Sequence, residues 1–311
     1  MARRAAESLK RVLVTGATGF VGRACLPQLA RRGFEIHAVS RRVRRGELGS
    51  WRQLDLLDRA ATEALVAEIR PTHLVHLAWG TSEGRHWDSR ENVTWLAASQ
   101  HLIEAFGSAG GRRLVAAGTC AEYGPSATAC SEEDTPIRPR SMYGACKAAL
   151  ATLIPAYAAT LGIESWAWAR LFHPYGPGDR AGRFIPTLID TLHRRERIAC
   201  TPGRQLRDFL YVDDCADALA RLVDSDVQGA INIASGEPIP VRQFVAEIGR
   251  QLDALDSIDF GARPASSLEL GDLVADVRRQ AAELAFCPAT PIVDGIERTI
   301  AWYRARGRFD A

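Results

Sequence analysis

Gly16-Ala17-Thr18-Gly19-Phe20-Val21-Gly22 joins a short apolar run, residues 11–15, to a segment with helical apolar spacing over 20–32. The run predicts a buried strand and the spacing predicts a helix. Gly16 permits a tight turn, and Gly19 lets backbone N–H groups approach a phosphate at the positive end of the helix dipole. Gly22 lets the helix pack closely on the strand. Glycine strings mark many turns, but this strand–loop–helix context predicts a dinucleotide-binding loop of Gly16, Thr18, Gly19, Phe20, Val21 and Gly22.

The end of the second expected strand, 34–40, indicates which dinucleotide is bound. Folds that bind NAD place an acidic residue there for the adenosine ribose, whereas an arginine accommodates the 2′-phosphate of NADP. This chain has Ser40, Arg41 and Arg42 at that point. A guanidinium can bind the phosphate in a bidentate manner, so NADP(H) is favoured and NAD(H) stays possible. Alternatively, the arginines form a solvated loop face in an arginine-rich chain.

Strands and helices alternate over the first 170 residues. Further strands are expected at 51–56, 72–78, 113–118 and 164–171, and helices at 59–69, 92–108 and 142–161. This alternation predicts an α/β fold with a Rossmann-type doubly wound parallel sheet. Beyond residue 171 the pattern becomes irregular, with a Gly- and Pro-rich loop at 173–183 and helices at 214–222, 241–252 and 291–306. We expect a dinucleotide-binding domain over 1–171, with returning segments at about 207–234, and a smaller C-terminal α/β substrate domain over 172–311.

Tyr143 and Lys147 lie four residues apart on an expected helix, so their side chains share one face. Free tyrosine has a pKa of about 10, and a neighbouring ammonium is expected to lower the pKa by favouring the phenolate. Thr119, at the end of the fifth strand, can donate a hydrogen bond to the reacting oxygen. These three residues predict a proton-transfer site. The alternatives are core packing for Tyr143 and a surface charge for Lys147, which is one of only two lysines in the chain.

Composition limits the other classes of function. A formal net charge of +2 indicates no broad basic surface, so no nucleic-acid partner is expected. The seven cysteines are scattered, without the spacing of a metal site or a disulfide framework. The first ten residues lack the apolar core of a secretory signal, and no apolar run has the length of a membrane helix. We therefore expect no metal, no membrane association and a cytoplasmic location.

Several motifs resemble those of the extended short-chain dehydrogenases/reductases of the sugar-nucleotide epimerase/dehydratase family. They are TGATGFVG at Thr15, HLAW at His76, GTCAEYG at Gly118, SMYGACK at Ser141, RLFHPYGPGD at Arg170, RDFLYVDDCADA at Arg207 and AWYR at Ala301. They span nearly the whole chain and are specific for the superfamily rather than for one member. The resemblance implies a Rossmann domain with a small C-terminal substrate domain. It also implies a homodimer formed through a four-helix bundle that includes the helices at 92–108 and 142–161.

The resemblance assigns roles by position. Thr119, Tyr143 and Lys147 match the catalytic triad, in which tyrosine exchanges a proton with a sugar oxygen while hydride moves to or from the nicotinamide. Tyr143 and Lys147 also contact the cofactor, together with Asp55, Leu56, Leu77, Ala78, Trp79, Asn92 and His173. Asn92 matches an asparagine that supports the active-site helix, and the His173 ring faces either the nicotinamide or the loop core. The expected substrate contacts are Cys120, Glu122, Arg183, Arg207 and Arg263. Arg207 and Arg263 bind the diphosphate or, alternatively, form an interdomain salt bridge.

Departures from the family patterns narrow the reaction. The 4,6-dehydratases place Asp-Glu directly after the catalytic threonine, where this chain has Cys120 and Ala121, so dehydration is disfavoured. Enzymes of the GDP-fucose synthase type need Cys at Ala121 and His at Gly178, so 3,5-epimerisation is disfavoured too. The expected activity is NADPH-dependent reduction of the C4 ketone of a nucleotide-linked 4-keto-6-deoxyhexose.

Three alternatives stay open. The first is a nucleotide-sugar 4-epimerase with tightly held NAD, and the second is a reductase of a lipid or polyketide carbonyl. The third is a non-catalytic sensor of NADP, although such proteins commonly lose the Tyr/Lys pair that this chain keeps.

Overall fold

The computed structural model describes residues 10–42, 48–80, 87–124, 126, 128–265 and 271–305. Its central feature is a seven-stranded sheet with the strand order β11-β6-β5-β4-β1-β2-β3. Every neighbouring pair in this sheet is parallel. The strands are β1 (Arg11–Thr15), β2 (Glu35–Ser40), β3 (Ser50–Gln53), β4 (His73–His76), β5 (Arg113–Thr119), β6 (Ser165–Leu171) and β11 (Gly229–Ile233).

The strand order reverses at β1, which pairs with β2 on one side and β4 on the other. Ligands of open α/β sheets bind outside the carboxyl ends of the strands at such a switch point. The glycine loop follows β1 at this place. The fold therefore brings the loop, the end of β2 and the end of β4 to one edge of the sheet.

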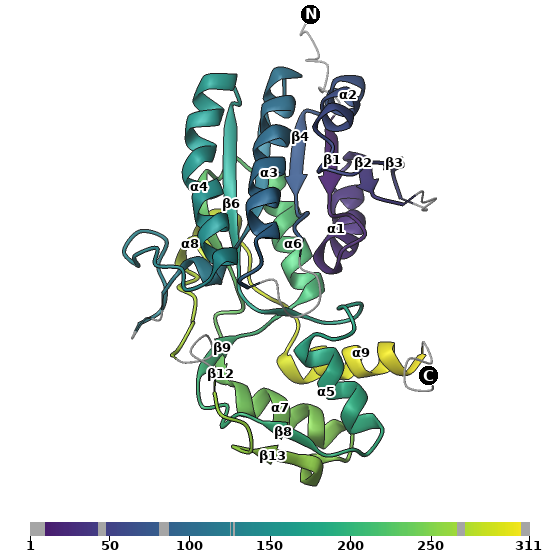
Figure 1. Cartoon of the computed structure of the whole chain (residues 1–311), viewed down its shortest axis with the longest axis vertical. Helices are drawn as coiled ribbons and strands as arrows, with labels where there is room; N and C mark the ends of the chain where they lie inside the picture. Colours follow the sequence, from purple (N-terminus) through teal and green to yellow (C-terminus); the bar gives the residue numbers. More distant parts are fainter. Residues whose placement is uncertain are drawn as a thin grey trace, which may run out of the picture.

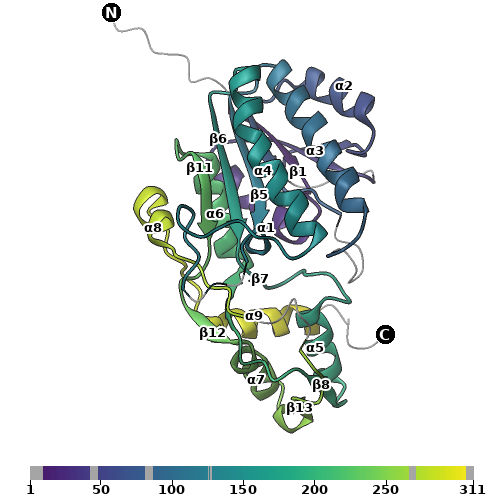
Figure 2. The same ribbon diagram turned by 60° about the vertical axis from the view of Figure 1, so that its left-hand side comes forward.

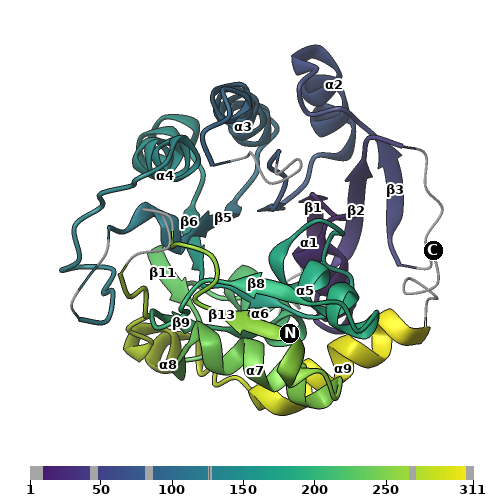
Figure 3. The ribbon, with the colours of Figure 1, turned by 60° about the horizontal axis from the view of Figure 1, so that its bottom comes forward.

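Helices cover both faces of the sheet (Figures 1 and 3). One core cluster joins α1 (Phe20–Arg31) and α6 (Val212–Val223) to one face, through side chains such as Leu29 and Leu219. The second joins α2 (Arg59–Ile69), α3 (Glu91–Ser108) and α4 (Met142–Leu161) to the other face, through Val66, Leu102 and Leu150. Burying near-continuous apolar strands on both faces is what a parallel sheet requires.

A smaller lobe lies beyond the carboxyl edge of the sheet (Figure 2). Its core packs Leu188, Phe244 and Ile300, one from each of its helices. The helices are α5 (Phe184–His193), α7 (Val241–Gln251) and α9 (Ile292–Ala305). Short strands complete the lobe and its junction, namely β7 (Pro174–Tyr175), β8 (Ile198–Cys200), β9 (Leu206–Asp208), β10 (Leu210–Tyr211), β12 (Pro238–Pro240) and β13 (Ile258–Phe260). The remaining elements are the 3-10 turns η1 (Cys120–Glu122) and η2 (Leu255–Ser257), and α8 (Arg278–Leu284), which packs on β11 and α6.

The expected Rossmann-type parallel sheet is confirmed. α2 and α4 have the residue ranges expected from the sequence, and most other elements of the sheet and its helices differ from expectation by one or two residues at their ends. The structure adds α5 and α8, which the sequence patterns did not predict.

Candidate active site

The glycine loop has the close backbone packing that a dinucleotide cradle needs. Gly16 has φ +69°, and a Cβ there would lie 2.7 Å from the backbone nitrogen of Ala78. A Cβ on Gly22 would lie 2.1 Å from the Gly16 carbonyl oxygen, so a larger residue would push α1 away from the loop. The Gly19 N–H donates to the Gly16 carbonyl at 2.8 Å and closes the turn.

The amino end of α1 is suited to an anion. Gly19 is exposed at the N-cap, no side chain caps the helix and its first turn holds no acidic residue. Thr18, Phe20 and Val21 are partly exposed around it. Because free N–H groups and the helix dipole favour negative charge, these residues fit the pyrophosphate of a dinucleotide.

The carboxyl end of β2 lies beside this loop. Ser40 is buried and its hydroxyl donates to the Arg42 carbonyl. The Arg41 carbonyl accepts from the Gln53 amide at 3.2 Å, and both arginine side chains project into solvent. These bonds fix the backbone and leave the guanidinium groups available. Asp55 is also exposed, with its carboxylate accepting from the Leu57 N–H at 3.1 Å, whereas Leu56 is buried.

The segment after β4 forms a second wall. The Ala78 N–H donates to the Thr15 hydroxyl at 3.3 Å, and Leu77 and Trp79 are partly exposed. The Trp79 indole donates to Asn92 Oδ1 at 2.8 Å, while Asn92 Nδ2 donates to the Ser89 carbonyl at 2.8 Å. Asn92 is 1% exposed. Its amide therefore orients the Trp79 ring and the start of α3.

Tyr143 lies in the first turn of α4. The Ser141 hydroxyl caps this helix by accepting from the Gly144 N–H at 3.1 Å. The Tyr143 N–H donates to the Trp87 carbonyl at 2.9 Å. The Tyr143 ring makes edge-on contacts with Trp87 and Trp79, at centroid distances of 5.7 and 6.3 Å. These contacts hold the tyrosine ring in one orientation.

Thr119 and Tyr143 come together as the sequence predicts. Burial raises the pKa of Tyr143 to about 12, and a hydrogen bond from the Thr119 hydroxyl opposes this rise. The Thr119 Oγ1 itself accepts from the Ala121 N–H at 3.2 Å, which holds the threonine side chain in place. Tyr143 is thus a protonated acid at neutral pH.

Lys147 lies one helical turn further along and is 3% exposed. Its ammonium donates to the Ala117 carbonyl at 2.8 Å and lies 4.0 Å from the centre of the Trp79 ring. Burial lowers the pKa of Lys147 to about 7, partly offset by the Glu122 carboxylate. The expectation that the Lys147 ammonium lowers the pKa of Tyr143 is wrong for this geometry, because burial dominates at Tyr143 and the ammonium binds Ala117 and Trp79.

Glu122 is not a substrate contact, and the sequence prediction is wrong here. Its side chain is 0% exposed. Its carboxylate accepts from the Thr119 N–H at 2.8 Å and from Arg170 Nε at 2.9 Å. The Trp168 indole donates to both carboxylate oxygens, at 2.9 and 3.0 Å. No ligand can reach oxygens enclosed in this way.

Cys120, His173 and Arg207 form a group beyond the ends of β5 and β6. Cys120 is 6% exposed, and burial raises the pKa of its thiol to about 12, while a hydrogen bond from the His173 backbone N–H to the sulfur opposes this rise. Burial, together with the Arg207 charge, lowers the pKa of His173 to about 3. The guanidinium of Arg207 donates to the carbonyls of Leu206 and Gly271, at 2.8 and 2.7 Å. These three residues lie near Thr119, where a substrate would meet the triad.

The other two expected substrate arginines lie in different places. Arg183 pairs with Asp179 at 3.5 Å, and its charge opposes the rise in the pKa of Tyr143. Arg263 is exposed beside Cys200, at the end of β8 in the smaller lobe. The structure thus brings Arg183 and Arg207 to the site and gives Arg263 a more remote position.

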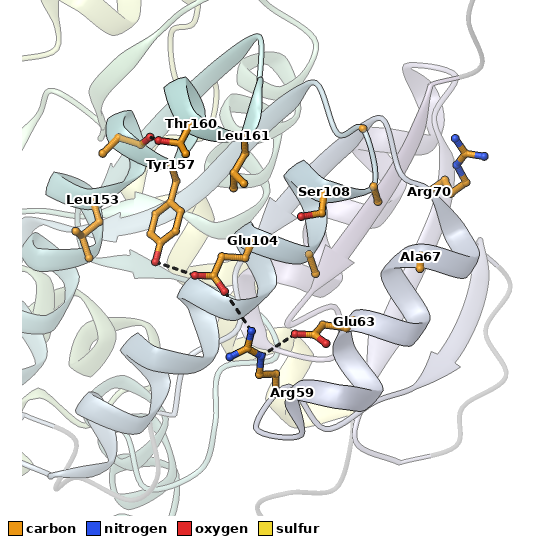
Figure 4. A pocket seen from close by; sticks show the side chains of 14 residues that line it. Arg59, Glu63, Ala67, Arg70, Glu104, Ser108, Leu153, Tyr157, Thr160 and Leu161 are labelled. Carbon is orange, nitrogen blue, oxygen red and sulfur yellow. Dashed lines mark hydrogen bonds and ion pairs between the residues drawn. The ribbon is translucent and has the colours of Figure 1, made fainter.

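The described residues also form a groove of about 1170 Å³ away from the glycine loop, between α2, α3 and α4 (Figure 4). Across it, Glu104 accepts from the Tyr157 hydroxyl at 3.2 Å and pairs with Arg59 at 3.7 Å. Among the described helices, α4 alone is long and apolar enough to cross a membrane by length and composition. It packs on α3, β5 and β6. Within the described ranges, no cluster of three metal-binding side chains occurs.

Comparison with known proteins agrees with this geometry. Residues 12–234 match the family described as "NAD dependent epimerase/dehydratase family". A Streptomyces 3-diazoavenalumate denitrifying reductase is 30% identical over 255 residues, which is 78% of this chain and 82% of the relative. UDP-glucuronic acid decarboxylase 1 of Xenopus tropicalis is 26% identical over 95% of this chain and 72% of its own. The solved structure of MoeE5 with UDP-glucuronic acid and NAD has a TM-score of 0.83 and 31% identity, covering 95% of this chain and 99% of MoeE5.

Proposed function

Because the chain belongs to the NAD dependent epimerase/dehydratase family, we propose that it is a sugar 4-ketoreductase. It would use NADPH to reduce the C4 ketone of a nucleotide-linked 4-keto-6-deoxyhexose. One observation carries the proposal: the side chains of Thr119 and Tyr143 are joined by a hydrogen bond, and the buried Lys147 lies one helical turn further along α4. This arrangement suits delivery of a proton to an oxygen that gains negative charge.

The reduction divides between the cofactor and the chain. When bound, NADPH would supply the hydride needed at C4. Tyr143 donates its proton to the ketone oxygen, which becomes the hydroxyl, and the phenolate regains a proton from solvent. Thr119 orients the phenol and stabilises the phenolate by hydrogen bonding. Lys147 would offer a hydrogen-bond donor to the cofactor ribose.

The exposed guanidinium groups at Arg41 and Arg42 support the choice of NADP(H). Replacing both with alanine is expected to weaken NADPH binding at least about tenfold and to leave NADH binding within about twofold. Arg194→Ala/Arg195→Ala, an adjacent exposed pair in the smaller lobe, is the matched control. An equal loss for both cofactors contradicts the assignment.

A nucleotide sugar is supported as the substrate class by MoeE5, which was solved with UDP-glucose and with UDP-glucuronic acid. Arg183, whose charge acts on the pKa of Tyr143, and Arg207, whose charge acts on the pKa of Cys120, are the candidate contacts for its diphosphate. The direct test is a screen of 4-keto nucleotide sugars with NADPH, following the loss of cofactor absorbance and the stereochemistry of the product. Tyr143→Phe is expected to abolish turnover and to leave cofactor binding intact. An unchanged biological output from this variant would favour the sensor hypothesis.

Two observations favour alternative functions that use the same hydride and proton transfer. MoeE5 binds NAD, which supports the alternative of a 4-epimerase that oxidises and re-reduces one carbon. That function predicts NAD copurifying with the protein and no net consumption of NADPH. The similarity to a denitrifying reductase supports a reductase whose substrate is not a sugar. Turnover of a 4-keto nucleotide sugar with stoichiometric NADPH oxidation distinguishes our proposal from both.

A further inference from the structure

Glu122 is the centre of a buried hydrogen-bond network next to Thr119, and the sequence did not indicate its role. The Glu122 carboxylate receives hydrogen bonds from the Thr119 N–H, the Trp168 indole and Arg170 Nε. All three partners are donors, so only an ionised carboxylate satisfies them all. A glutamine has a single acceptor oxygen and would turn its NH₂ group towards another donor.

The neighbouring backbone is shaped for this carboxylate. A Cβ on Gly118 would lie 2.2 Å from Trp168 Nε1 and 2.6 Å from Glu122 Oε1. Gly118 therefore leaves the space in which the carboxylate and the indole meet. Trp168 and Arg170 are two residues apart on β6, so their side chains project from the same face of the strand. Arg170 also donates to the Tyr123 hydroxyl at 2.8 Å and extends the network to Asn232.

Glu122 acts on Thr119 through the backbone. The two residues form a reciprocal cap on η1, in which Glu122 accepts from the Thr119 N–H while Thr119 Oγ1 accepts from the turn at Ala121. These bonds fix both ends of Thr119. The hydrogen bond from the Thr119 hydroxyl to Tyr143, which opposes the rise in the tyrosine pKa, depends on this placement.

The charge of Glu122 also faces the catalytic lysine. Trp168 binds the carboxylate, and its ring centre lies 5.8 Å from Lys147 Nζ. Arg170 on β6 offsets part of this negative charge, while Cys120 and the phenols of Tyr123 and Tyr143 surround it. On β4, His76 also faces the lysine, since the Lys147 charge contributes to the lowered pKa of His76.

We infer that Glu122 is a positioning residue: its buried carboxylate fixes Thr119 so that the threonine hydroxyl stays directed at Tyr143, and its charge supports the ammonium form of Lys147. The catalytic consequence rests on the proposed function. The electrostatic consequence does not, because it concerns the protein without substrate.

The first experiment uses the low lysine content of the chain. With lysine labelled with ¹³C, Lys10 and Lys147 give the only side-chain lysine signals, and Lys10 is an internal reference. Glu122→Gln is expected to lower the pKa of Lys147 by at least about half a pH unit, whereas Glu122→Asp keeps the charge and leaves it near the wild-type value. Glu132→Gln is the matched control, since Glu132 accepts from the Asn232 N–H on the same side of the fold. An unchanged Lys147 titration in Glu122→Gln overturns the electrostatic part.

The second experiment tests positioning by turnover. Glu122→Gln and Glu122→Asp are both expected to lower kcat at least about tenfold, with cofactor affinity within about threefold of wild type. In a Thr119→Ala background the same changes should cost no more than about twofold, because the residue they act through is gone. An equal loss in both backgrounds overturns the positioning role.

Two further results keep the outcomes separate. If Glu122→Gln fails to fold, Trp168→Phe is used instead, because it removes one donor to the Glu122 carboxylate. It is expected to lower kcat less than Glu122→Gln would. In a Thr119→Ala background, Trp168→Phe should cause no further loss of kcat. A loss that persists in that background overturns the positioning role. If the wild type reduces no 4-keto sugar, the proposed function fails, while the Lys147 titration still decides the effect of the Glu122 charge.

Discussion

Lys147 occupies a site that fits an ammonium and leaves little room for a larger cation. One carbonyl, that of Ala117, and one ring face, that of Trp79, contact its nitrogen. A guanidinium is planar and carries five donors, so arginine would bury donors without partners. Lys147→Arg is expected to lower kcat at least about 100-fold. Lys10→Arg is the control, since Lys10 is exposed and paired with Asp224. A loss of less than about threefold would contradict this account.

His76 gives the stability of the protein a pH dependence. Its ring contacts the hydroxyls of Thr15 and Ser99, at 2.7 and 2.8 Å. Burial, together with the Lys147 charge, lowers its pKa to about 3. Since the fold favours neutral His76, its stabilising contribution is complete above about pH 6.5 and is lost as the pH falls towards 3.

A variant without the imidazole isolates this contribution. Each pKa unit corresponds to about 1.4 kcal/mol, so His76→Gln should reduce the loss of stability between pH 6.5 and 4.5 by about 2–3 kcal/mol. The measurement is urea unfolding at several pH values. His73 and His173, whose pKa values are also lowered by burial, remain in both proteins and cancel in the comparison. Equal pH slopes for the two proteins would contradict the prediction.

The residues of the triad were predictable because the signals are local. Tyr143 and Lys147 are one helical turn apart, and Thr119 ends a buried strand. The role of Glu122 was not predictable in this way, because its partners Trp168 and Arg170 lie 46 and 48 residues further along the chain. The raised pKa of Tyr143 was also missed, because the extent of burial depends on tertiary packing.

At the scale of elements, the junction of β1 and α1 leaves no room for a side chain at Gly22. Gly22→Ala places a Cβ against the Gly16 carbonyl, so helix and loop must separate. We expect a loss of about 1–3 kcal/mol in unfolding free energy and at least about tenfold weaker cofactor binding. Denaturant unfolding and cofactor titration measure the two effects.

Gly124→Ala provides the comparison for this variant. A Cβ on Gly124 would lie 3.2 Å from Arg138 Cβ and 3.3 Å from the Arg138 carbonyl oxygen, so a shift of a few tenths of an ångström at Arg138 relieves both contacts. Its effect on cofactor binding is expected to stay within about twofold. Similar losses for the two variants would show that the loop tolerates a side chain at Gly22.

An element could be predicted from the sequence when its apolar residues repeat with a clear period. The strands of the large sheet are apolar runs bounded by turn residues, and α2 and α4 carry clear start and stop signals. α5 begins at Phe184, directly after a Gly- and Pro-rich segment, and that segment obscured its start. The strands of the smaller lobe contain two or three residues each, so alternation cannot reveal them. They form only because distant segments pair.

At the scale of the whole molecule, the outer faces of α3 and α4 present small and apolar side chains. Val93 is 52% exposed on α3, and Thr152, Ala156 and Ala159 are exposed on α4. We propose that two copies associate through these helices, as the family resemblance implies. Light scattering is expected to give the mass of a dimer for the wild type and of a monomer for Thr152→Arg/Ala156→Arg. Ala282→Arg on α8 is the control, and a wild-type monomer would contradict the proposal.

The close fit at Gly118 also constrains how this chain can change during evolution. Because a side chain at position 118 would overlap both Trp168 and Glu122, the three positions are not independent. A lineage that replaces the glycine must first lose the indole or the carboxylate, and each intermediate leaves a buried group without its partner. In an alignment of relatives, glycine at 118, glutamate at 122 and tryptophan at 168 should therefore be inherited together or lost together.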